Sequence, residues 1–528
     1  MRSSVSGRGQ CVPRDGMVRL VWHHVLVLVT LCFFVRLPAP AAAGPEGTLT
    51  FGVHVSIAPT WFDPAETPGI VTPYLFYYLM HDALAKALPE ANPAPALAES
   101  WSASADGLTH EFVLRPGTKF HDGSPVTAED VRFSFERYRG VSQATMKERV
   151  AAIEIVNERT VRLKMKTPWP DFFNYYLGTT SAGWIVPKAY VQKTGEDGFK
   201  KAPIGAGPYK FVSFTPGVEL TVEAVEGYWR KTPSVKRLVF RVIPDEAVRL
   251  VALKRGEIDI ALSIRGELAQ SILQTPGLSL QATSSPGIFW IYFPDQWDPK
   301  SPWHDRRVRE AARHAMDYDS INNNLLLGHG KIHGGMIPDN FEYYVPVPPP
   351  KYDPARARAL LAEAGYPNGF DAGFYYCDSS YSNLAEVVLN NLAEAGIRAN
   401  LRPMERVAFA KAYSEKKLQN IVQGGSAAFG NTATRFEVFA VKGGSYAYGS
   451  YPDIDELFTR QAGEMDRGKR GAILADMQHR LDESRMYAPI WQLAFLNGVG
   501  PRVGVSGFNL IKGYIYAAPY EDITLKSK

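Results

Sequence analysis

The sequence predicts an α/β protein with mixed sheets that is divided into two or three lobes. The chain has 528 residues, and about 485 remain if the first 43 are removed as a leader. A chain of that length exceeds what one hydrophobic core normally holds. Strand-like and helix-like segments alternate along it. Residues 373–402 read as strand, helix and strand, which is the order of a βαβ unit with two parallel strands.

The first 43 residues predict a secretory signal peptide. Basic residues come first, an apolar stretch spans residues 20–35, and a Pro- and Ala-rich segment, residues 38–43, follows. The 16 residues between Arg19 and Arg36 are fewer than the roughly 20 that a membrane-spanning helix needs. We therefore expect export and cleavage near Ala43. Met17 is an alternative start, which would give a leader of more ordinary length.

Removal of this leader changes the charge balance. It takes away five Arg and one Asp, so 53 of 58 basic and 53 of 54 acidic residues remain. A neutral chain gives no argument for nucleic acid as a partner. Of the three cysteines only Cys377 remains, so no intrachain disulfide can form, and we interpret Cys377 as a buried strand residue.

The first part of the mature chain predicts strands separated by turns and helices. Residues Thr48–Val55 alternate as a strand does, and the aromatic-rich segment Val71–Leu88 reads as a helix. Glu111–Leu114 is a second alternating strand, and two Gly-containing turns follow it. A helix then starts after Thr127, because Thr127 as N-cap and Asp130 three positions later approximate a capping box.

The later part continues the alternation. Val161–Lys166 alternates as a strand, and Phe289–Phe293 reads as a buried strand. Asp305–Asp317 predicts a helix, and so does Asp353–Gly365, with Asp353 as N-cap, proline at the first helical position and a glycine at the end. The βαβ unit consists of strand Gly373–Tyr376, helix Asn383–Ala395 and strand Arg398–Arg402.

Residues 96–138, ALAESWSASADGLTHEFVLRPGTKFHDGSPVTAEDVRFSFERY, closely resemble the signature segment of the bacterial extracellular solute-binding proteins of family 5. The helices at 305–317 and 353–365 also resemble this family, and the similarity recurs from about Leu49 to Asp482. The resemblance implies a periplasmic binding protein-like fold of type II, cluster C, with mixed-sheet lobes around a hinged ligand cleft. The implied division is 1–43 signal peptide, 44–83 first part of lobe I, 84–203 lobe II, 204–284 second part of lobe I, 285–497 lobe III and 498–528 return to lobe I.

The sequence offers no motif for catalysis, a cofactor or a metal. It contains no His-Glu-x-x-His, no phosphate loop ending in Gly-Lys-Ser/Thr and no Cys pair for zinc. Gly424–Ala428 and Gly443–Ala447 both lack the last glycine of a nucleophile elbow. His329 and His333 have a metal-like spacing but lie among glycines, so they do not share a helix face. We expect a protein that is not an enzyme and that has no cofactor.

The resemblance places ten candidate ligand-binding residues at the cleft. They are Trp61, Phe62, Trp290, Tyr292, Tyr381, Gly425, Ser426, Phe429, Asn431 and Arg435. Peptide-binding relatives typically carry an aspartate near this last group, which pairs with the ammonium of the ligand. This chain has no acidic residue between Glu415 and Glu437, and a buried ammonium without a partner would cost several kcal/mol.

That segment instead offers neutral groups and an arginine. Such a set favours a hydroxylated or anionic ligand, since Arg435 could bind a carboxylate or phosphate through two hydrogen bonds. The alternative is a surface loop in which Arg435 is merely solvated. The ligand is left open among modified peptides, opine- or sugar-like compounds and metal chelates.

The function that the resemblance implies is a periplasmic receptor for a small solute. It would deliver the solute to an ABC-type permease complex in the inner membrane, act as a monomer and bind no nucleic acid. Closure of the lobes around the solute would provide the signal to the permease. The alternatives are an exported sensor or chaperone on the same fold, and a secreted hydrolase.

Overall fold

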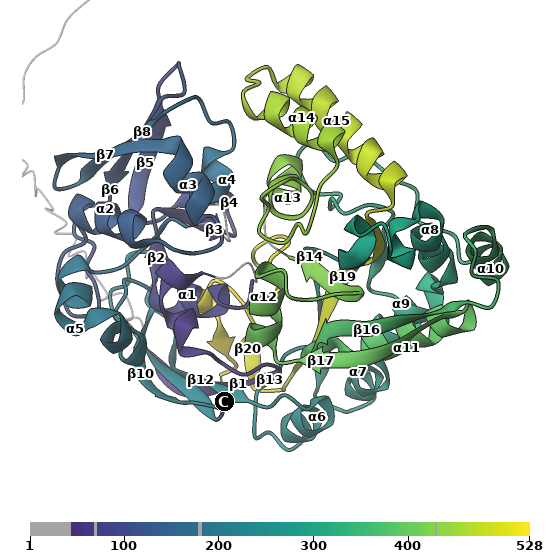
Figure 1. Ribbon diagram of the computed structural model, residues 1–528. Helices are drawn as coiled ribbons and strands as arrows, with labels where there is room; N and C mark the ends of the chain where they lie inside the picture. Colours follow the sequence, from purple (N-terminus) through teal and green to yellow (C-terminus); the bar gives the residue numbers. More distant parts are fainter. Residues whose placement is uncertain (1–43, 68–70, 178–181, 428–429, 528) are drawn as a thin grey trace, which may run out of the picture. The chain divides into compact units, whose positions relative to one another are not determined.

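The structure is a computed structural model that describes residues 44–67, 71–177, 182–427 and 430–527. Residues Gly44–Lys528 form one compact unit (Figure 1). The predicted signal peptide lies outside the described residues. Within the described ranges no helix is both long and apolar enough to cross a membrane.

The largest sheet is mixed and has eleven described strands. Ten follow the order β10-β11-β12-β1-β13-β19-β14-β18-β16-β17, and β15 pairs with β19. Strand β1 is parallel to β12 and β13, and β16 is parallel to β17 and β18. The bounds are β1 Glu46–Val53, β10 Tyr209–Thr215, β11 Glu219–Ala224, β12 Val235–Val242, β13 Ile260–Ala261, β14 Ser279–Tyr292, β15 Lys331–Ile332, β16 Phe370–Asp378, β17 Ile397–Met404, β18 Ile421–Ser426 and β19 Tyr487–Val499.

Strands β14 and β19 are the longest in this sheet and join its two halves. They pair antiparallel from Ser279 with Val499 to Tyr292 with Tyr487, and the pairing shifts register between Ser284 and Ile288. The expected passage from lobe I to lobe III, after residue 284, falls at this irregularity. One continuous sheet therefore connects the two regions.

A second sheet has the order β5-β6-β8-β7 and a separate core. Its strands are β5 Ala98–Ala103, β6 Thr109–Leu114, β7 Val150–Asn157 and β8 Thr160–Met165. Three two-stranded sheets complete the description: β2 Asp82–Ala83 with β9 Trp184–Ile185, β3 Ala85–Leu88 with β4 Ala91–Pro95, and β20 Val503–Val505 with β21 Thr524–Leu525. In Figure 1 the four-stranded sheet is blue, and helices α14 and α15, at the far end of the colour scale, are yellow-green.

The helices cover these sheets. Their bounds are α1 Tyr74–Met80, α2 Ala128–Arg137, α3 Gln143–Arg149, α4 Phe172–Tyr176, α5 Lys188–Lys201, α6 Glu246–Lys254, α7 Gly266–Leu273, α8 Arg306–Ala315, α9 Tyr318–Leu326, α10 Pro354–Glu363, α11 Ser382–Glu394, α12 Arg406–Ser414, α13 Thr432–Phe439, α14 Pro452–Ala462 and α15 Arg467–Ser484. Short 3-10 turns are η1 Pro59–Phe62, η2 Pro64–Glu66, η3 Pro294–Trp297, η4 Pro302–His304, η5 Ser379–Tyr381 and η6 Tyr520–Asp522.

The cap signals in the sequence locate helix starts well. Thr127 and Asp130 form the capping box of α2, where the Thr127 amide donates to the Asp130 carboxylate at 2.9 Å. Asp353 accepts from the Arg356 amide at the start of α10.

The βαβ unit is confirmed, since β16 and β17 are parallel with α11 between them. Cys377 is a buried residue of β16, and burial raises the pKa of its thiol to about 12.

The single helix expected over Val71–Leu88 is wrong. Helix α1 ends at Met80, and the chain continues into β2 and β3. Strand β2 pairs with the distant β9, and β3 pairs with β4, the next strand along the chain. A short apolar run fits a buried helix and a buried strand equally well, so only these partners decide between them.

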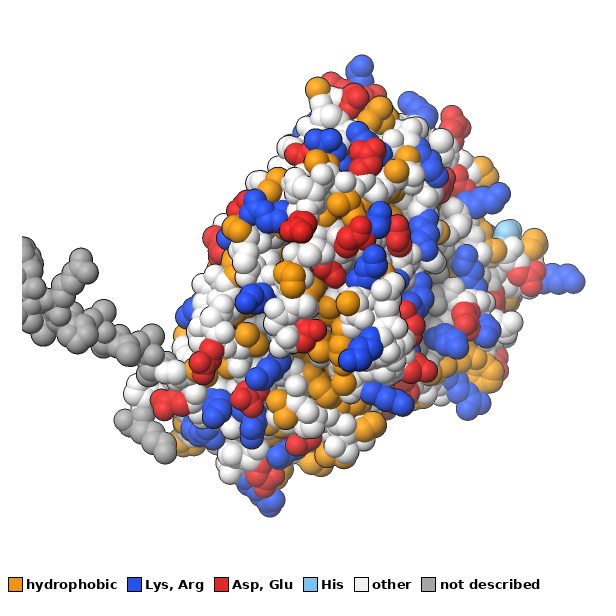
Figure 2. Space-filling view, turned by 90° about the vertical axis from the view of Figure 1, so that its left-hand side faces the viewer, with side chains coloured by type: hydrophobic (Ala, Val, Ile, Leu, Met, Phe, Trp, Pro, Cys, Tyr) orange, Lys and Arg blue, Asp and Glu red, His pale blue; other side chains and the backbone are white. Residues whose placement is uncertain are grey.

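Figure 2 shows basic and acidic side chains intermingled over the face that it presents. This distribution agrees with the balance of 53 basic and 53 acidic residues after the leader. A surface of mixed sign does not favour a polyanionic partner.

A buried ion pair between Lys86 and Asp82 helps to hold residues 82–86 against residues 228–229. Lys86 lies 2.9 Å from Asp82, and both side chains are fully buried. Tyr228 donates to the same carboxylate at 2.8 Å, and Trp229 donates at 2.6 Å. We expect Lys86→Met to lower the free energy of unfolding by about 3–5 kcal/mol, because it leaves the Asp82 charge buried without its cation.

Thermal unfolding of Lys86→Met and of the double variant Lys86→Met/Asp82→Asn provides the measurement. The double variant should lose less stability than the single one, because it removes both charges. Equal losses would show that the ion pair is not the source of the effect.

Candidate ligand-binding site

An inner cavity lies where several distant segments converge. It encloses about 780 Å³, including the part open to solvent. The residues that line it are Val71, Phe289, Asp378, Tyr381, Arg406, Phe409, Ala410, Tyr413, Gln423, Gly424, Gly425, Ser426, Ala427, Phe439, Tyr446, Phe495 and Ile515. The cavity is therefore built from the first part of the chain, both long connecting strands and the C-terminal half.

The sheet topology accounts for this position. Strands β16, β17 and β18 are parallel and end at Asp378, Met404 and Ser426. The carboxyl ends of parallel strands meet at one edge of a sheet, where open α/β folds bind their ligands. The residues that follow β16 and β17 therefore enter the same cavity as the end of β18.

Helix α12 separates the inner cavity from a second, outer cleft of about 1060 Å³. Arg406, Phe409, Ala410 and Tyr413 line the cavity, while Val407, Ala410, Lys411 and Ser414 line the cleft. Each set has the spacing i, i+3, i+4, i+7, which defines one face of a helix. Ala410 and Tyr446 belong to both spaces, so the two adjoin.

Besides α12, three parts of the chain wall the outer cleft. Thr60, Trp61, Glu66 and Thr67 precede α1, Arg139, Gly140 and Val141 follow α2, and Ser445 and Tyr446 follow α13. Glu66 in this wall already pairs with Arg139 at 2.6 Å and with Lys200 at 3.2 Å. The cleft thus places the charged side chains of Glu66, Arg139 and Lys411 beside the inner cavity.

A buried ion pair supplies the charge of the inner cavity. Arg406 Nη1 lies 2.5 Å from Asp378 Oδ2, and the two side chains are 12% and 9% exposed. Burial alone would lower the pKa of Arg406, but Asp378, Tyr381 and Tyr516 together outweigh burial, and the pKa is raised. The Nε atom of Arg406 is buried and has no hydrogen-bond partner among the described residues.

Two further cationic groups, Arg265 and Arg249, act on His54 together with Arg406. Arg265 stands 5.0 Å from the centre of the Tyr381 ring and pairs with Glu246 at 2.5 Å. Buried Arg249 donates to the backbone carbonyls of Ile243 and Ser263. Burial lowers the pKa of Arg249 to about 10.

The positive charges of these arginines act on His54, which lies one residue beyond the end of β1. Its ring is 4% exposed, and neither ring nitrogen has a partner among the described residues. Burial lowers the pKa of His54 well below its usual value, and the charges of Arg249, Arg406 and Arg265 lower it further. The imidazole is therefore neutral.

Arg435 lines neither the inner cavity nor the outer cleft. Its side chain is 4% exposed, so the alternative of a solvated surface residue is wrong. Its guanidinium donates to the Ser426 carbonyl at 3.1 Å and lies 5.2 Å from the centre of the Phe341 ring. Burial lowers the pKa of Arg435 to about 9.

Asn431 has a structural role rather than a position in the cavity wall. It caps α13 by accepting from the Thr434 amide at 3.0 Å. Its side-chain nitrogen donates to Asp171 at 2.6 Å, and Arg470 binds the other oxygen of that carboxylate. Asn431 therefore joins the segments expected as lobe III and lobe II.

The other candidates fall into three groups. Tyr381, Gly425 and Ser426 line the inner cavity, and Trp61 lines the outer cleft. Phe62, Trp290 and Tyr292 are fully buried core residues that line neither space. Phe429 lies outside the described residues.

Arg406 and Asp378 were missed, although the sequence carried a signal for them. Each stands within two residues of the end of a strand in the βαβ unit. Such positions meet at the carboxyl edge of the sheet. Asp378 also supplies an acidic group that residues 416–436 lack, but this carboxylate is already bound to Arg406.

Among the described residues, one cluster of three carboxylate side chains has a spacing suited to a metal ion. It consists of Asp63, Glu66 and Glu196. Cations already hold it, because Arg137 binds Asp63 at 2.7 Å and Arg139 binds Glu196 at 2.7 Å. These contacts explain the cluster without a metal.

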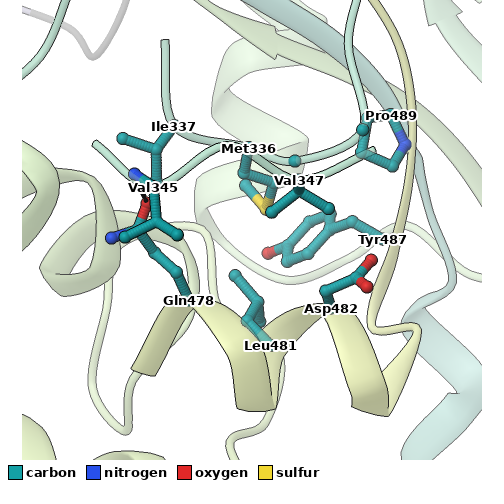
Figure 3. A pocket seen from close by; sticks show the side chains of 11 residues that line it. Met336, Ile337, Val345, Val347, Gln478, Leu481, Asp482, Tyr487 and Pro489 are labelled. Atoms are coloured by element: carbon teal, nitrogen blue, oxygen red, sulfur yellow. Dashed lines mark hydrogen bonds between the residues drawn. The ribbon is translucent and has the colours of Figure 1, made fainter. Parts of the chain in front are cut away.

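A smaller pocket of about 380 Å³ lies apart from these spaces (Figure 3). Met336, Ile337, Val345 and Val347 face Leu481 and Tyr487 across it. Gln478 holds the loop above it by accepting from the Val345 amide at 3.0 Å. It shares no lining residue with the inner cavity or the outer cleft.

Comparison with known proteins gives consistent matches. Residues 92–447 match the bacterial extracellular solute-binding proteins, family 5 Middle. The glutathione-binding protein GsiB of Pectobacterium atrosepticum is 32% identical over 316 residues, which cover 58% of this chain and 60% of that protein. The alignment thus spans three fifths of the length of this curated relative.

Solved structures match over more of the chain. MoaA from A. tumefaciens R10, in complex with mannopinic acid, is 26% identical, with a TM-score of 0.80 and coverage of 91% of this chain and 100% of that one. The periplasmic binding protein DppA from Helicobacter pylori, in complex with the peptide STSA, is 22% identical, with a TM-score of 0.79 and coverage of 91% and 98%. The second likeness shows the fold.

The geometry of the inner cavity leads to a prediction for Gly425. A Cβ atom added there would lie 2.9 Å from Cδ2 of Phe289, which lines the cavity. We expect Gly425→Ala to displace the Phe289 ring and to weaken binding in the cavity about tenfold or more, with the fold retained. Titration calorimetry with the small molecule that co-purifies with the protein provides the measurement.

Gly463→Ala is the matched control, because a Cβ atom at Gly463 would meet nothing within 4 Å. This variant should bind as the wild type does. Equal affinity of all three proteins would place the bound molecule away from Phe289.

Proposed function

The chain belongs to family 5 of the bacterial extracellular solute-binding proteins, and from this premise we propose that it captures a small solute for an ABC-type import permease. One observation carries the proposal. The inner cavity is lined jointly by Val71 from the first part of the chain, by Phe289 and Phe495 from the connecting strands, and by α12. A solute in this position would contact segments of the expected lobe I and of the expected lobe III.

We propose that the site closes by bending of β14 and β19, with the lobe division given above. The register shift between Ser284 and Ile288 supports this position for the hinge, because interrupted pairing costs less to bend than a continuous ladder. The solute shifts the population toward the closed form to the extent that it binds that form more tightly.

Contacts between the expected lobes II and III support a closed form held by specific bonds. Asp171 binds Asn431 and Arg470, as described above. Glu437 accepts from Thr145 at 2.7 Å and from the Tyr175 hydroxyl. We call these four partners of Asp171 and Glu437, together with the two acids, the lobe contact.

Buried polar groups make the lobe contact selective for one arrangement. Asp171 is 5% exposed, and the side chain of Arg470 is 4% exposed. Burial raises the pKa of Glu437, while its hydrogen bonds with Tyr175 and Thr145 lower it. Separation of the lobes would return these groups to water, so the free energy of closure depends on how well they pair.

The remaining parts of the proposal concern location and delivery. We propose export through the leader, residence in the periplasm, and docking of the closed form on a permease in the inner membrane. The protein would release its solute unchanged. The curated relative binds glutathione by its name, and MoaA was solved with mannopinic acid, so small polar solutes are the class to test first.

A peptide held by its free amino terminus fits the inner cavity less well. Its ammonium would need a carboxylate, and Asp378 is the acid that lines the cavity. Arg406 already neutralises that acid at 2.5 Å. An ammonium would have to displace Arg406 and leave the guanidinium buried without its partner.

Native mass spectrometry of the mature protein purified from its own host tests the proposal. We expect a bound small molecule of defined mass, which denaturation releases chemically unchanged. A protein that carries no solute and is stabilised by none in a thermal-shift screen would contradict the receptor function.

The lobe contact gives a separate prediction. Asp171→Ala removes the carboxylate that buried Arg470 binds, so we expect the affinity for the co-purified solute to fall at least about tenfold, or 1.4 kcal/mol. The residues that line the inner cavity are unchanged in this variant. Titration calorimetry measures the affinity.

Asp453→Ala provides the control, since Asp453 also pairs with an arginine of α15, Arg480, but both side chains are more than 40% exposed. Exposed pairs contribute little, so this variant should bind normally. Unchanged affinity of Asp171→Ala would show that the lobe contact does not stabilise the bound form.

A further inference from the structure

We infer that the solute carries a carboxylate and that Arg406 binds this group in the inner cavity. The inference rests on the proposed function and names the class of solute that the site takes. Three observations support it: the unused hydrogen-bonding capacity of Arg406, the local excess of cations, and the engagement of Asp378.

Contacts hold the Arg406 side chain in place, but one of its N–H groups has no hydrogen-bond partner among the described residues. Its Nη1 is bound to Asp378, and its guanidinium carbon lies 6.0 Å from the centre of the Tyr381 ring. The buried Nε has no partner among the described residues. An unpaired buried N–H costs about 1–3 kcal/mol, and a carboxylate can satisfy two guanidinium N–H groups at once.

The region around Arg406 contains more cations than direct acidic partners. Arg249, Arg265 and Arg406 all act on His54, whereas Glu246 and Asp378 are the carboxylates that pair with Arg265 and Arg406. Arg249 has carbonyl partners and no carboxylate within ion-pair distance among the described residues. Asp245 and Glu246 also act on Arg249, but Asp245 is exposed, so the buried groups leave a positive potential that would attract an anion.

The aromatic wall indicates how the rest of the solute is held. Phe409, Tyr413, Phe439 and Tyr446 line the cavity together with Arg406. Few polar side chains and an apolar wall are usual for sites that fix the orientation of a small ligand through one charged anchor. The adjoining outer cleft offers room for a polar extension of the solute.

Isothermal titration with matched pairs of probes tests the inference. The probes are glutathione and mannopinic acid, each compared with the derivative in which every carboxylate is a primary amide. We expect at least one acid to bind the wild type, and its amide to bind about 100-fold more weakly. Equal binding of acid and amide overturns the inference.

Variants then assign the contact to Arg406. Arg406→Gln should lose about 100-fold in affinity for the acid and none for the amide. Arg406→Lys keeps the charge that balances Asp378 but loses the planar fork, so it should lose about tenfold and preserve the fold. Arg480→Gln, on the exposed face of α15, should change neither affinity. Binding of the acid by both Arg406 variants as tightly as by the wild type overturns the assignment.

The result separates this inference from the proposed function. If neither acid binds and the co-purified solute has no carboxylate, the inference fails. The proposed receptor function still holds in that case if the co-purified solute binds in the cavity. If the co-purified solute has a carboxylate, it replaces the two probes in the same comparison of acid with amide.

Discussion

The carboxyl edge shared by strands β16, β17 and β18 brings together the charged pair and one wall of the site. Because these strands are parallel, the residues after each of them enter one space, although they are up to about fifty positions apart in the sequence. Asp378 is the last residue of β16, Arg406 comes two residues after β17, and Gly425 and Ser426 end β18. The ion pair between Asp378 and Arg406 then fixes the first turn of α12, and α12 forms one wall of both the inner cavity and the outer cleft.

The site is not completed by that edge alone. Strands β14 and β19 carry Phe289 and Phe495 into the cavity and continue into the half of the sheet that contains β1. The lobe contact adds buried polar bonds from residues 145–175 to residues 431–470. A receptor that closes around its solute needs both features, namely a connection that bends and contacts that form only in one arrangement.

Local rules predicted the scaffold better than the site. Capping residues such as Thr127 and Asp353 located helices because their hydrogen bonds are made within one turn. The strand Phe289–Phe293 was also found, but the wrong face of it was chosen. Trp290 and Tyr292 point into a core, while their neighbour Phe289 lines the cavity. Side chains alternate along a strand, so only the packing partners reveal which set faces the ligand.

Arg435 and Arg406 also show that a local sequence pattern does not reveal which side chains line the cavity. Arg435 lies in the segment that the family resemblance emphasises, yet it is buried beside Phe341. Arg406 had no such prominence, although its spacing with Phe409, Ala410 and Tyr413 marks one helix face. The position of α12 over the sheet edge depends on contacts between distant residues, and a local pattern cannot supply these.

Small-angle X-ray scattering of the mature protein, with and without its co-purified solute, tests the central claim most directly. If the solute closes the site by bending β14 and β19, the radius of gyration falls when the solute is added at saturation. An unchanged radius at saturation, with binding confirmed by calorimetry in the same sample, would contradict capture by closure.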